Sequence, residues 1–528
     1  MALGAHQTHR SPIVGNLRVP PPAAGSAPEG DVDPEEPVAV VLELNLLYPG
    51  GLAAVTAGFF TLWEGLPEWA HAPSPAQPTT SPTEPAVPAG LQRVTSKLYQ
   101  CVLSRVQLQA VMAVDRAEAD RAGRPALLFK AWPDYEIYPQ VDRSAPTVKA
   151  DAAWRAYNAR GRGVVWAVVD SGIDGCHPHF AALDLAAEAG AVPGSPSIRT
   201  AGLHRDFTAL VRLPGDPQPG PPAPLTDEQG HGTHVAGIIA GETPAGHAPH
   251  VAASDEPAEG AGFVPRTQVG VLAGMAPECE LVSLKVLRRT AQGVWMTSSA
   301  AVMAALEYLR TEVNVDPGLL RVHGVNISLG CDWDPTHYAA GRSPLCQAVN
   351  QLVRSGVVIV VSTGNGGGGQ SPTGPGALSV LGSITEPAHA EECIAVGSTH
   401  RDAPHAFGVS WTSSRGPTLD GRLKPDVVAP GEWITSAATG LVRSRSGLDG
   451  LPADDPDRLL TYAEQSGTSM AAPHVSGVVA AFLSARPEFI GRPEQVKRLL
   501  TETATDLGRE HYAQGAGVVD LMRMLANA

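Results

Sequence analysis

The sequence predicts an α/β fold with a mostly parallel sheet, preceded by a small α+β domain. Beyond about residue 146, short apolar runs alternate with helical patterns, and unbroken apolar runs are typical of strands covered on both faces. The 528 residues suffice for two domains, and a hydrophobic content of 43% suffices for a sizeable core. Because functional groups gather at the carboxyl ends of parallel strands, polar residues directly after the apolar runs are the candidates for a site.

The N-terminal part of the chain predicts one disordered segment and one small domain. Residues 1–36 are rich in Pro, Gly and Ala, which predicts disorder. Residues 37–145 predict the α+β domain. Its expected elements are a strand at 38–47, a helix at 52–66, a Pro-rich insertion at 71–90, a strand at 97–103, a helix that Ser104 opens with Gln107 placed for a capping box, and two short strands within 125–141.

Residues 146–528 predict the larger α/β domain. Helical patterns separate several of its β-rich runs, as at 296–313, and we find no internal repeat. The β-rich runs lie at 163–169, 279–287, 322–330, 355–365 and 392–399.

Composition restricts the partners and the compartment. A formal net charge of −15 argues against nucleic acid and anionic membrane surfaces as partners. No stretch is long and apolar enough to span a bilayer, and the N-terminus lacks the apolar core of a secretory signal, so the cytoplasm is the expected location. Leaderless secretion stays open. The six cysteines lack metal-binding CxxC spacing; Cys331 and Cys346 could pair across a loop, but free thiols are favoured.

Three polar residues stand at the ends of predicted elements. Asp170 ends the strand in VVWAVVDSGIDGCHPHF, although alone it also fits a turn aspartate. His231 lies between two glycines at an expected helix start in DEQGHGTHVAGIIAG. Zinc binding by His231 and His234 is disfavoured, because the spacing is too short for HExxH and no acidic residue separates them; His234 is expected to be structural.

Ser469 lies at the expected amino end of a helix in SGTSMAAPHVSG. It could simply cap the helix, but an amino end also stabilises a developing negative charge. Pro473 is expected in the first turn, where a missing N–H costs little. His474 is expected to be a buried packing residue. A serine needs a nearby base to become a nucleophile, histidine has a suitable pKa, and a carboxylate can orient the imidazole.

Asn365 offers a donor for the oxyanion that such a reaction forms. It follows the apolar run of VVIVVSTGNGGGG and opens a glycine stretch. Its side-chain amide could donate together with the backbone N–H of Ser469. Taken alone, Asn365 fits a turn asparagine equally well.

Together these segments resemble the subtilisin-like serine peptidases, the subtilase family. The resemblance covers roughly residues 146–527, and the motifs occur in the family's order, Asp, then His, then Ser. They are VVDSGIDGCHPHF, GHGTHVAGIIAG, GMAPECELVSLKVL, VNISLG, VVIVVSTGNGG, SSRGPTLDGRLKPDVVAPG and SGTSMAAPHVSG. The resemblance implies a three-layer subtilisin-like fold and a serine endopeptidase that acts on polypeptides through an acyl-enzyme.

The resemblance also implies a role for each matched position. It makes Asp170 the orienting carboxylate, His231 the general base and acid, Ser469 the nucleophile and Asn365 the oxyanion donor. One wall of the substrate cleft would be Ser328, Leu329 and Gly330, and the opposite wall Ser362, Thr363 and Gly364. The edge of the first wall would pair with an extended peptide. Lys285 is expected to be structural.

The sequence departs from the family in several loops. The family's calcium loop is not recognisable in AEGAGFVPRTQ, which follows an insertion at about 242–268, so we expect no required cofactor and assign no metal ligand, while calcium stays open. Gly366 stands where some relatives carry an acid, which favours a neutral or apolar side chain before the cleaved bond. Insertions at about 331–345 and 440–462 are placed to narrow the cleft.

The N-terminal domain has the position of a subtilase propeptide, which acts as an intramolecular chaperone and inhibitor and is removed by self-cleavage. The cut would then fall within 138–147. A permanent regulatory or docking domain is the rival interpretation. For the whole chain, the alternatives to an endopeptidase are a silent peptide-binding homologue and an esterase on the same fold.

Overall fold

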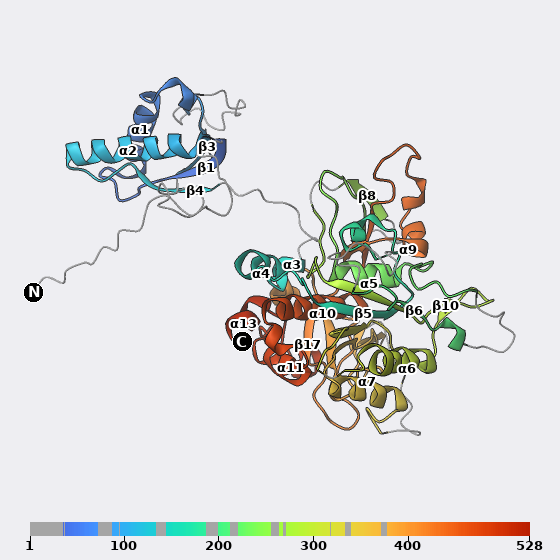
Figure 1. Ribbon diagram of the computed structural model, residues 1–528. Coiled ribbons are helices and arrows are strands. Elements are labelled where there is room, and N and C mark those ends of the chain that lie inside the picture. The colour runs from blue at the N-terminus through green and yellow to red at the C-terminus, as the bar shows by residue number, and fades with distance from the viewer. Residues whose placement is uncertain are drawn as a thin grey trace, which may run out of the picture. The chain divides into compact units, whose positions relative to one another are not determined.

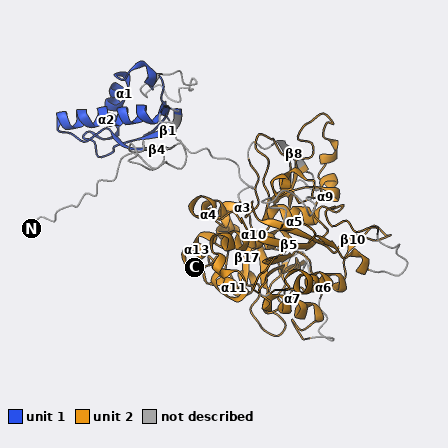
Figure 2. Cartoon of the chain, in the orientation of Figure 1, with its two compact units in different colours: residues 1–137 blue, residues 138–528 orange. Residues whose placement is uncertain are grey.

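The structure is a computed structural model of the chain. It describes residues 35, 37–71, 87–93, 96–133, 144–185, 199–211, 220–254, 263–267, 271–316, 318–332, 339–370 and 377–528. The predictions for the segments 1–36, 71–90 and 138–147 fall mostly outside these residues. The chain divides into two compact units, residues 1–137 and 138–528 (Figure 2), and each is described by itself.

The N-terminal unit is a four-stranded antiparallel sheet with two helices. The strand order is β2-β3-β1-β4, where β1 is Pro37–Leu44, β2 Gln92–Arg93, β3 Leu98–Ser104 and β4 Leu128–Pro133. The helices are α1, Gly51–Glu64, and α2, Arg105–Ala122. The predicted capping box is present: the Ser104 hydroxyl accepts from the Gln107 N–H, and the Gln107 side chain accepts from the Ser104 N–H. Phe59, Trp63 and Tyr99 form the centre of its core.

The larger unit contains a seven-stranded sheet in which every neighbouring pair is parallel. The strand order is β17-β16-β13-β12-β5-β9-β6. The strands are β5 Val165–Asp170, β6 Arg205–Asp206, β9 Glu280–Lys285, β12 Gly324–Ile327, β13 Val358–Ser362, β16 Ile394–Thr399 and β17 Val427–Pro430. This confirms the predicted parallel sheet.

Helices cover both faces of this sheet, so the unit has three layers (Figure 1). One face carries α4 Ala150–Tyr157, α5 His231–Ile239, α10 Thr468–Ala485, α11 Pro493–Glu502 and α13 Leu521–Ala526. The other carries α6 Ser299–Tyr308, which continues as a π-helical turn Leu309–Val313, and α7 Pro344–Arg354. The shorter helices are α3 Ser144–Thr147, α8 Pro404–Phe407, α9 Gly440–Arg445 and α12 His511–Gln514.

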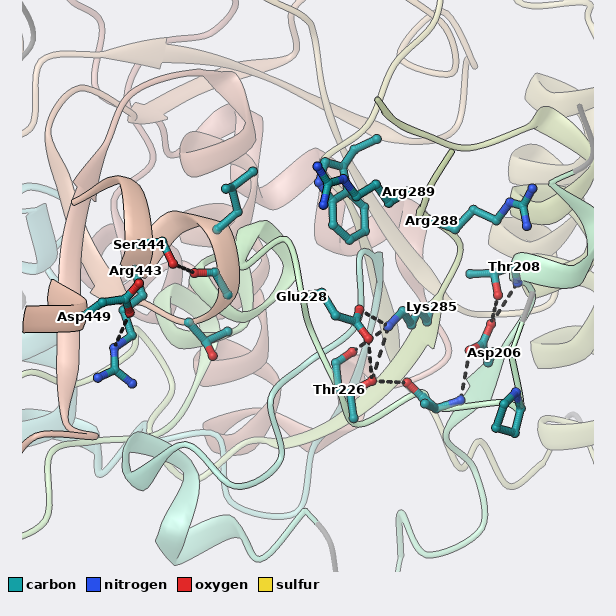
Figure 3. A pocket seen from close by; sticks show the side chains of 17 residues that line it. Asp206, Thr208, Thr226, Glu228, Lys285, Arg288, Arg289, Arg443, Ser444 and Asp449 are labelled. Atoms are coloured by element: carbon teal, nitrogen blue, oxygen red, sulfur yellow. Dashed lines mark hydrogen bonds and ion pairs between the residues drawn. The ribbon is translucent and has the colours of Figure 1, made fainter. Parts of the chain in front are cut away.

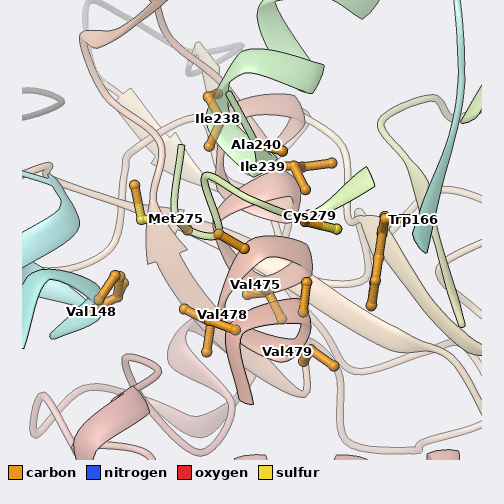
Figure 4. Packing of buried hydrophobic residues seen from close by; sticks show 14 of the residues in the cluster. Val148, Trp166, Ile238, Ile239, Ala240, Met275, Cys279, Val475, Val478 and Val479 are labelled. Carbon is orange, nitrogen blue, oxygen red and sulfur yellow. The ribbon is translucent and has the colours of Figure 1, made fainter. Parts of the chain in front are cut away.

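Side chains along β5 point alternately into the two hydrophobic cores on either side of the sheet. Trp166 and Val168 point to the layer of α5 and α10, whereas Val165, Ala167 and Val169 point to the layer of α6 and α7. Figure 4 shows valines of α10 packed with the end of α5 and with Trp166. Contrary to the expectation that no stretch could span a bilayer, helix α10 is long and apolar enough to do so, but most of it is buried in this core, as in a core helix of a globular domain.

A second sheet, which the sequence analysis did not anticipate, lies in the same unit. Its order is β18-β19-β7-β8, with β7 His250–Ser254, β8 Phe263–Thr267, β18 Ile434–Ala437 and β19 Thr461–Gln465. The predicted insertion at 242–268 therefore supplies a hairpin that pairs with β19, the strand just before Ser469. Two small hairpins complete the described strands: β10 Arg288–Arg289 with β11 Trp295–Met296, and β14 Gly368–Gln370 with β15 Ala377–Ser379.

Candidate active site

Asp170 and His231 form a hydrogen-bonded pair. Asp170 is the last residue of β5 and His231 the first of α5, and the Nδ1 of His231 lies 2.8 Å from Oδ1 of Asp170. The Asp170 side chain is fully buried, while the His231 side chain is 21% exposed. The buried carboxylate therefore fixes the orientation of an imidazole whose other edge remains accessible.

Two glycines allow this approach. A Cβ on Gly232 would come within 2.2 Å of the Gly172 carbonyl, so the first turn of α5 can lie against the turn after β5 only with glycine there. Gly230 precedes α5 with φ of +93°, and a Cβ on it would meet the Thr439 carbonyl at 2.2 Å. The glycines on either side of His231 thus bring its imidazole to the end of β5.

Asp227 anchors the loop before His231, and the sequence analysis missed it. Its two carboxylate oxygens accept hydrogen bonds from Ser171 Oγ, the Gly230 N–H, and both the N–H and Oγ1 of Thr233, at 2.7–2.8 Å. Ser171 Oγ in turn accepts from the Gly232 N–H at 2.9 Å. Asp227 is buried, and its position just before GHGTH was the available signal. Asp227 and Ser171 act as positioning residues for His231.

The surroundings of His231 favour its charged form. Burial lowers the pKa of the imidazole, but the charge and hydrogen bond of Asp170, together with the charge of Asp227, outweigh that effect and raise the pKa above its ordinary value of 6.5. The pair therefore stabilises an imidazolium, the species that a histidine base becomes when it accepts a proton.

Ser469 is the second residue of α10, as expected, and does not cap the helix. The N-cap position is Gly467, and no side chain caps this end. The Oγ of Ser469 donates to the carbonyl of Ser328 at 3.2 Å. In the part of the chain that the structure describes, no hydrogen bond joins His231 to Ser469.

Pro473 lies deeper in α10 than predicted. It is the sixth residue of the helix rather than a first-turn residue, so it deprives the Ser469 carbonyl of its N–H partner four residues on. The hydroxyl of Ser328 takes that place and donates to the Ser469 carbonyl at 2.9 Å. Ser328 Oγ accepts from Asn326, whose amide oxygen accepts from Ser476 of α10 at 2.9 Å. The proline therefore ties the backbone of Ser469 to the end of β12.

Asn365 faces the start of α10 from the loop after β13. Its Oδ1 accepts from the N–H of Thr468 at 3.0 Å and from Thr468 Oγ1 at 3.2 Å. Thr468 Oγ1 also accepts from the Gly364 N–H at 3.1 Å. With its oxygen held in this way, Asn365 keeps its amide Nδ2 as a donor at the start of α10, where a Cβ on Gly467 would lie 3.2 Å from it. The N–H of Ser469 lacks an intrahelical partner in this first turn.

The two predicted cleft walls both contact Thr385. A Cβ on Gly330 or on Gly364 would lie within 2.8 Å of Thr385 side-chain atoms, and Thr385 Oγ1 donates to the Thr363 carbonyl at 3.2 Å. Ser362 and Thr363 are themselves buried, so this wall is available only through its backbone and Gly364. Thr385, which the sequence analysis missed, joins the loops after β12 and β13.

The remaining candidate histidines are engaged elsewhere. The Nε2 of His234 lies 3.0 Å from the Ala463 carbonyl, and burial lowers its pKa to about 3. The ring of His474 lies 2.8 Å from the Met470 carbonyl and 2.9 Å from Ser144 Oγ, and burial lowers its pKa to about 4. Both fit the structural roles expected for them.

No metal or disulfide is assigned to the site. Among the described residues, no group of three or more His, Cys, Asp or Glu side chains is placed to share a metal ion. The six cysteines are unpaired; Cys331 is exposed and Cys346 is buried.

A polar cavity of about 990 Å³ adjoins the loop that precedes His231 (Figure 3). Lys285 at its base donates to Glu228 at 2.7 Å and to the Thr226 carbonyl at 2.9 Å, which supports the structural role predicted for it. Asp206 accepts from Thr208, and Asp449 lies 3.4 Å from Arg443. The carboxylates of this cavity are therefore paired within the chain.

A comparison with protein families covers the region that holds these residues. The model of the subtilase family matches residues 161–518, which include all four residues discussed above at the ends of β5, α5, β13 and α10. The chain belongs to the subtilase family. This confirms the resemblance drawn from the seven motifs.

Several characterised proteins are similar to this subtilase. M-protease of Shouchella clausii (strain KSM-K16) is 30% identical over 68% of this chain and 63% of its own length. Serine protease AprX of Bacillus subtilis (strain 168) is 30% identical over 68% of this chain and 65% of its own length. Subtilisin E of the same strain is 30% identical over 73% of this chain and 72% of its own length. The chain thus spans less than two thirds of the first two relatives.

Proposed function

We propose that this subtilase is a serine endopeptidase that hydrolyses peptide bonds through an acyl-enzyme on Ser469. The observation that carries the proposal is the 2.8 Å hydrogen bond between the buried carboxylate of Asp170 and the accessible imidazole of His231. The names of the related serine proteases support the same activity. A serine that only capped a helix would need no histidine oriented by a carboxylate, whereas a nucleophilic serine does.

The first half of the reaction forms the acyl-enzyme. Ser469 Oγ leaves the Ser328 carbonyl, passes its proton to Nε2 of His231 and bonds to the carbonyl carbon of the substrate. The substrate carbonyl oxygen becomes an oxyanion, which accepts hydrogen bonds from Nδ2 of Asn365 and the N–H of Ser469. The imidazolium of His231, paired with Asp170, then protonates the leaving amine as the peptide C–N bond breaks.

The second half releases the acyl group. Water takes the position of the amine, gives a proton to His231 and attacks the ester carbon. As the second oxyanion collapses, the bond from carbon to Ser469 Oγ breaks, the imidazolium returns the proton to Oγ, and the carboxylic acid product leaves. The same donors serve both oxyanions. Asn365 stays aligned in both steps because Thr468 holds its amide oxygen.

We place an extended polypeptide along the two cleft walls. Residues 328–330 follow β12 directly and offer backbone groups to a peptide strand, and such pairing does not depend on side-chain identity. Gly364 and Thr385 line the opposite side near Asn365. Side-chain selection then depends on the cavities beside these walls.

Labelling by a fluorophosphonate probe tests the proposal. The folded chain should react at one residue, and peptide mapping should locate the adduct on Ser469. The matched Ser469→Ala variant should not label. Equal labelling of both proteins would contradict an activated Ser469 and favour a silent peptide-binding role. Cleavage of ester substrates without cleavage of peptides would favour an esterase instead.

Hydrolysis should depend on the protonation of His231. Because the folded-state pKa of His231 is raised, the neutral base forms only above about pH 6.5, and kcat/KM should rise through a midpoint above that value. The stabilising contribution of the imidazolium has the opposite sign: it is present below pH 6.5 and is lost as the pH passes the folded pKa. A pH series on one peptide substrate measures the midpoint, and a value at or below 6.5 would contradict this assignment.

We further propose that the N-terminal unit is an inhibitor and folding aid that the enzyme removes itself. This α+β unit is compact and has its own core. It ends at residue 137, and the predicted cleavage segment 138–147 follows directly in the sequence. Intact-mass measurement of purified protein beside Ser469→Ala tests this. A mass loss of the N-terminal unit only in the active protein supports self-removal; full-length, fully active enzyme would favour a permanent regulatory domain.

A further inference from the structure

A second cavity, of about 330 Å³, begins at the first cleft wall. Leu329 and Gly330 line it, and they directly follow Ser328, whose carbonyl accepts the Ser469 hydroxyl. Most of its lining is apolar. The apolar side chains include Leu287, Trp295, Met296, Val302, Ile327, Leu329 and Leu345. The cavity is large enough for one long side chain of a peptide that lies along this wall.

One carboxylate interrupts the apolar lining. Glu386 borders the cavity, is 5% exposed, and follows Thr385, the residue that joins the two cleft walls. Its backbone is fixed by two hydrogen bonds with Cys331, at 2.9 and 3.0 Å. Its Oε1 is buried and accepts no hydrogen bond. Among the described residues, Glu386 forms no ion pair with a Lys, Arg or His side chain.

Two cysteines, Cys346 and Cys331, lie close to Glu386. Burial raises the pKa of the Cys346 thiol, and Glu386 raises it further; burial and then Glu386 also raise the pKa of Cys331. The Cys346 side chain forms a hydrogen bond with Glu386, but a thiol is a weak donor without positive charge, so this contact does not neutralise the carboxylate. A buried carboxylate without a cationic partner is costly, and a cation that enters the cavity would remove that cost.

We infer that this cavity is a subsite for a basic side chain of the substrate, and that Glu386 determines that preference. The methylene stem of a lysine or arginine packs along the apolar lining, while its charged head pairs with the carboxylate. An acidic or short side chain would leave Glu386 without a cationic partner. The inference rests on the proposed peptidase function, because it places a substrate in the cleft beside Ser469.

A peptide series with matched neutral analogues tests the inference. Each position on either side of one cleavable bond carries lysine or norleucine in turn, and arginine or citrulline in a second set. For the wild-type protein we expect kcat/KM to favour the charged residue by at least about tenfold at one position. In Glu386→Gln that preference should fall to about twofold or less, with fluorophosphonate labelling of Ser469 unchanged.

Glu280→Gln is the matched control. Glu280 is also a buried carboxylate, 4% exposed with one unpartnered oxygen, but it begins β9 and does not border the cavity. It should keep the wild-type preference. A wild-type protein that does not distinguish lysine from norleucine at any position would overturn the inference even if Glu386→Gln fails to fold. A preference that survives in a folded Glu386→Gln would overturn it as well.

Failure of the peptidase proposal gives a different result. In that case wild type cleaves no peptide, and binding of the same fluorescent peptides to Ser469→Ala replaces turnover as the measurement. Tighter binding of the lysine peptide than of the norleucine peptide, lost in the double variant with Glu386→Gln, would support the subsite without catalysis. Equal binding of the two peptides would overturn it.

Discussion

Replacement of His231 with alanine should lower kcat/KM for a peptide substrate by about 10⁴-fold or more while the fold persists. The variant loses the base for Ser469 and the acid for the leaving amine. His231 begins α5 at an accessible position, and the buried anchors of that turn, Asp227 and Thr233, remain in place. Initial rates on an internally quenched peptide, with circular dichroism to verify folding, provide the measurement.

A double variant provides a second test of the role of His231. Because nucleophile and base act together, the double variant His231→Ala with Ser469→Ala should be no slower than the slower single variant. His405→Ala provides a matched control, since His405 is exposed on α8. Near-normal hydrolysis by folded His231→Ala would refute the assigned role.

Substitution of Asn365 should have the second-largest effect. The donor is used only when the oxyanion forms, so Asn365→Ala should lower kcat by about 10²–10³-fold with little change in KM. Alanine also removes the acceptor of the Thr468 N–H, which carries a modest stability cost. Steady-state kinetics over a range of substrate concentrations separate the two parameters.

Two further variants separate hydrogen-bond donation by the Asn365 amide from the positioning of its side chain by Thr468. Asn365→Asp keeps an oxygen for Thr468 but has no amide donor, so it should lose about as much kcat as alanine. Thr468→Val removes one of the two anchors of the Asn365 oxygen and leaves the donor, so its loss should be about tenfold or less. A larger loss in Thr468→Val than in Asn365→Ala would contradict an oxyanion role for Asn365.

Local patterns predicted much of the fold and the site. The unbroken apolar run at 163–169 predicted β5, and Asp170 ends that strand as expected. The glycines on either side of His231 were visible in the sequence, and Gly232 packs on the Gly172 carbonyl. The capping box at Ser104 also formed as predicted. These features depend mainly on residues that are close together in the sequence.

Other features depended on contacts between distant segments. Pro473 was expected in the first turn, but the helix begins at Thr468, and the carbonyl that the proline leaves free finds Ser328 across 141 residues. The sequence indicated only an insertion at about 242–268, yet this segment forms the β7–β8 hairpin, which pairs with β19. Short polar segments carry no periodicity that identifies a distant partner.

The sequence by itself determined the alternation of strands and helices around the parallel sheet, the family, and the polar residues at the ends of β5, α5 and α10 and in the loop after β13. Only the tertiary structure decided that Asp227 supports the His231 loop, that Thr385 joins the two cleft walls, and that Glu386 borders an apolar cavity without a cationic partner. The physical reason is that burial and pairing of a polar group are set by atoms brought together across the fold, and a residue's sequence neighbours do not encode them.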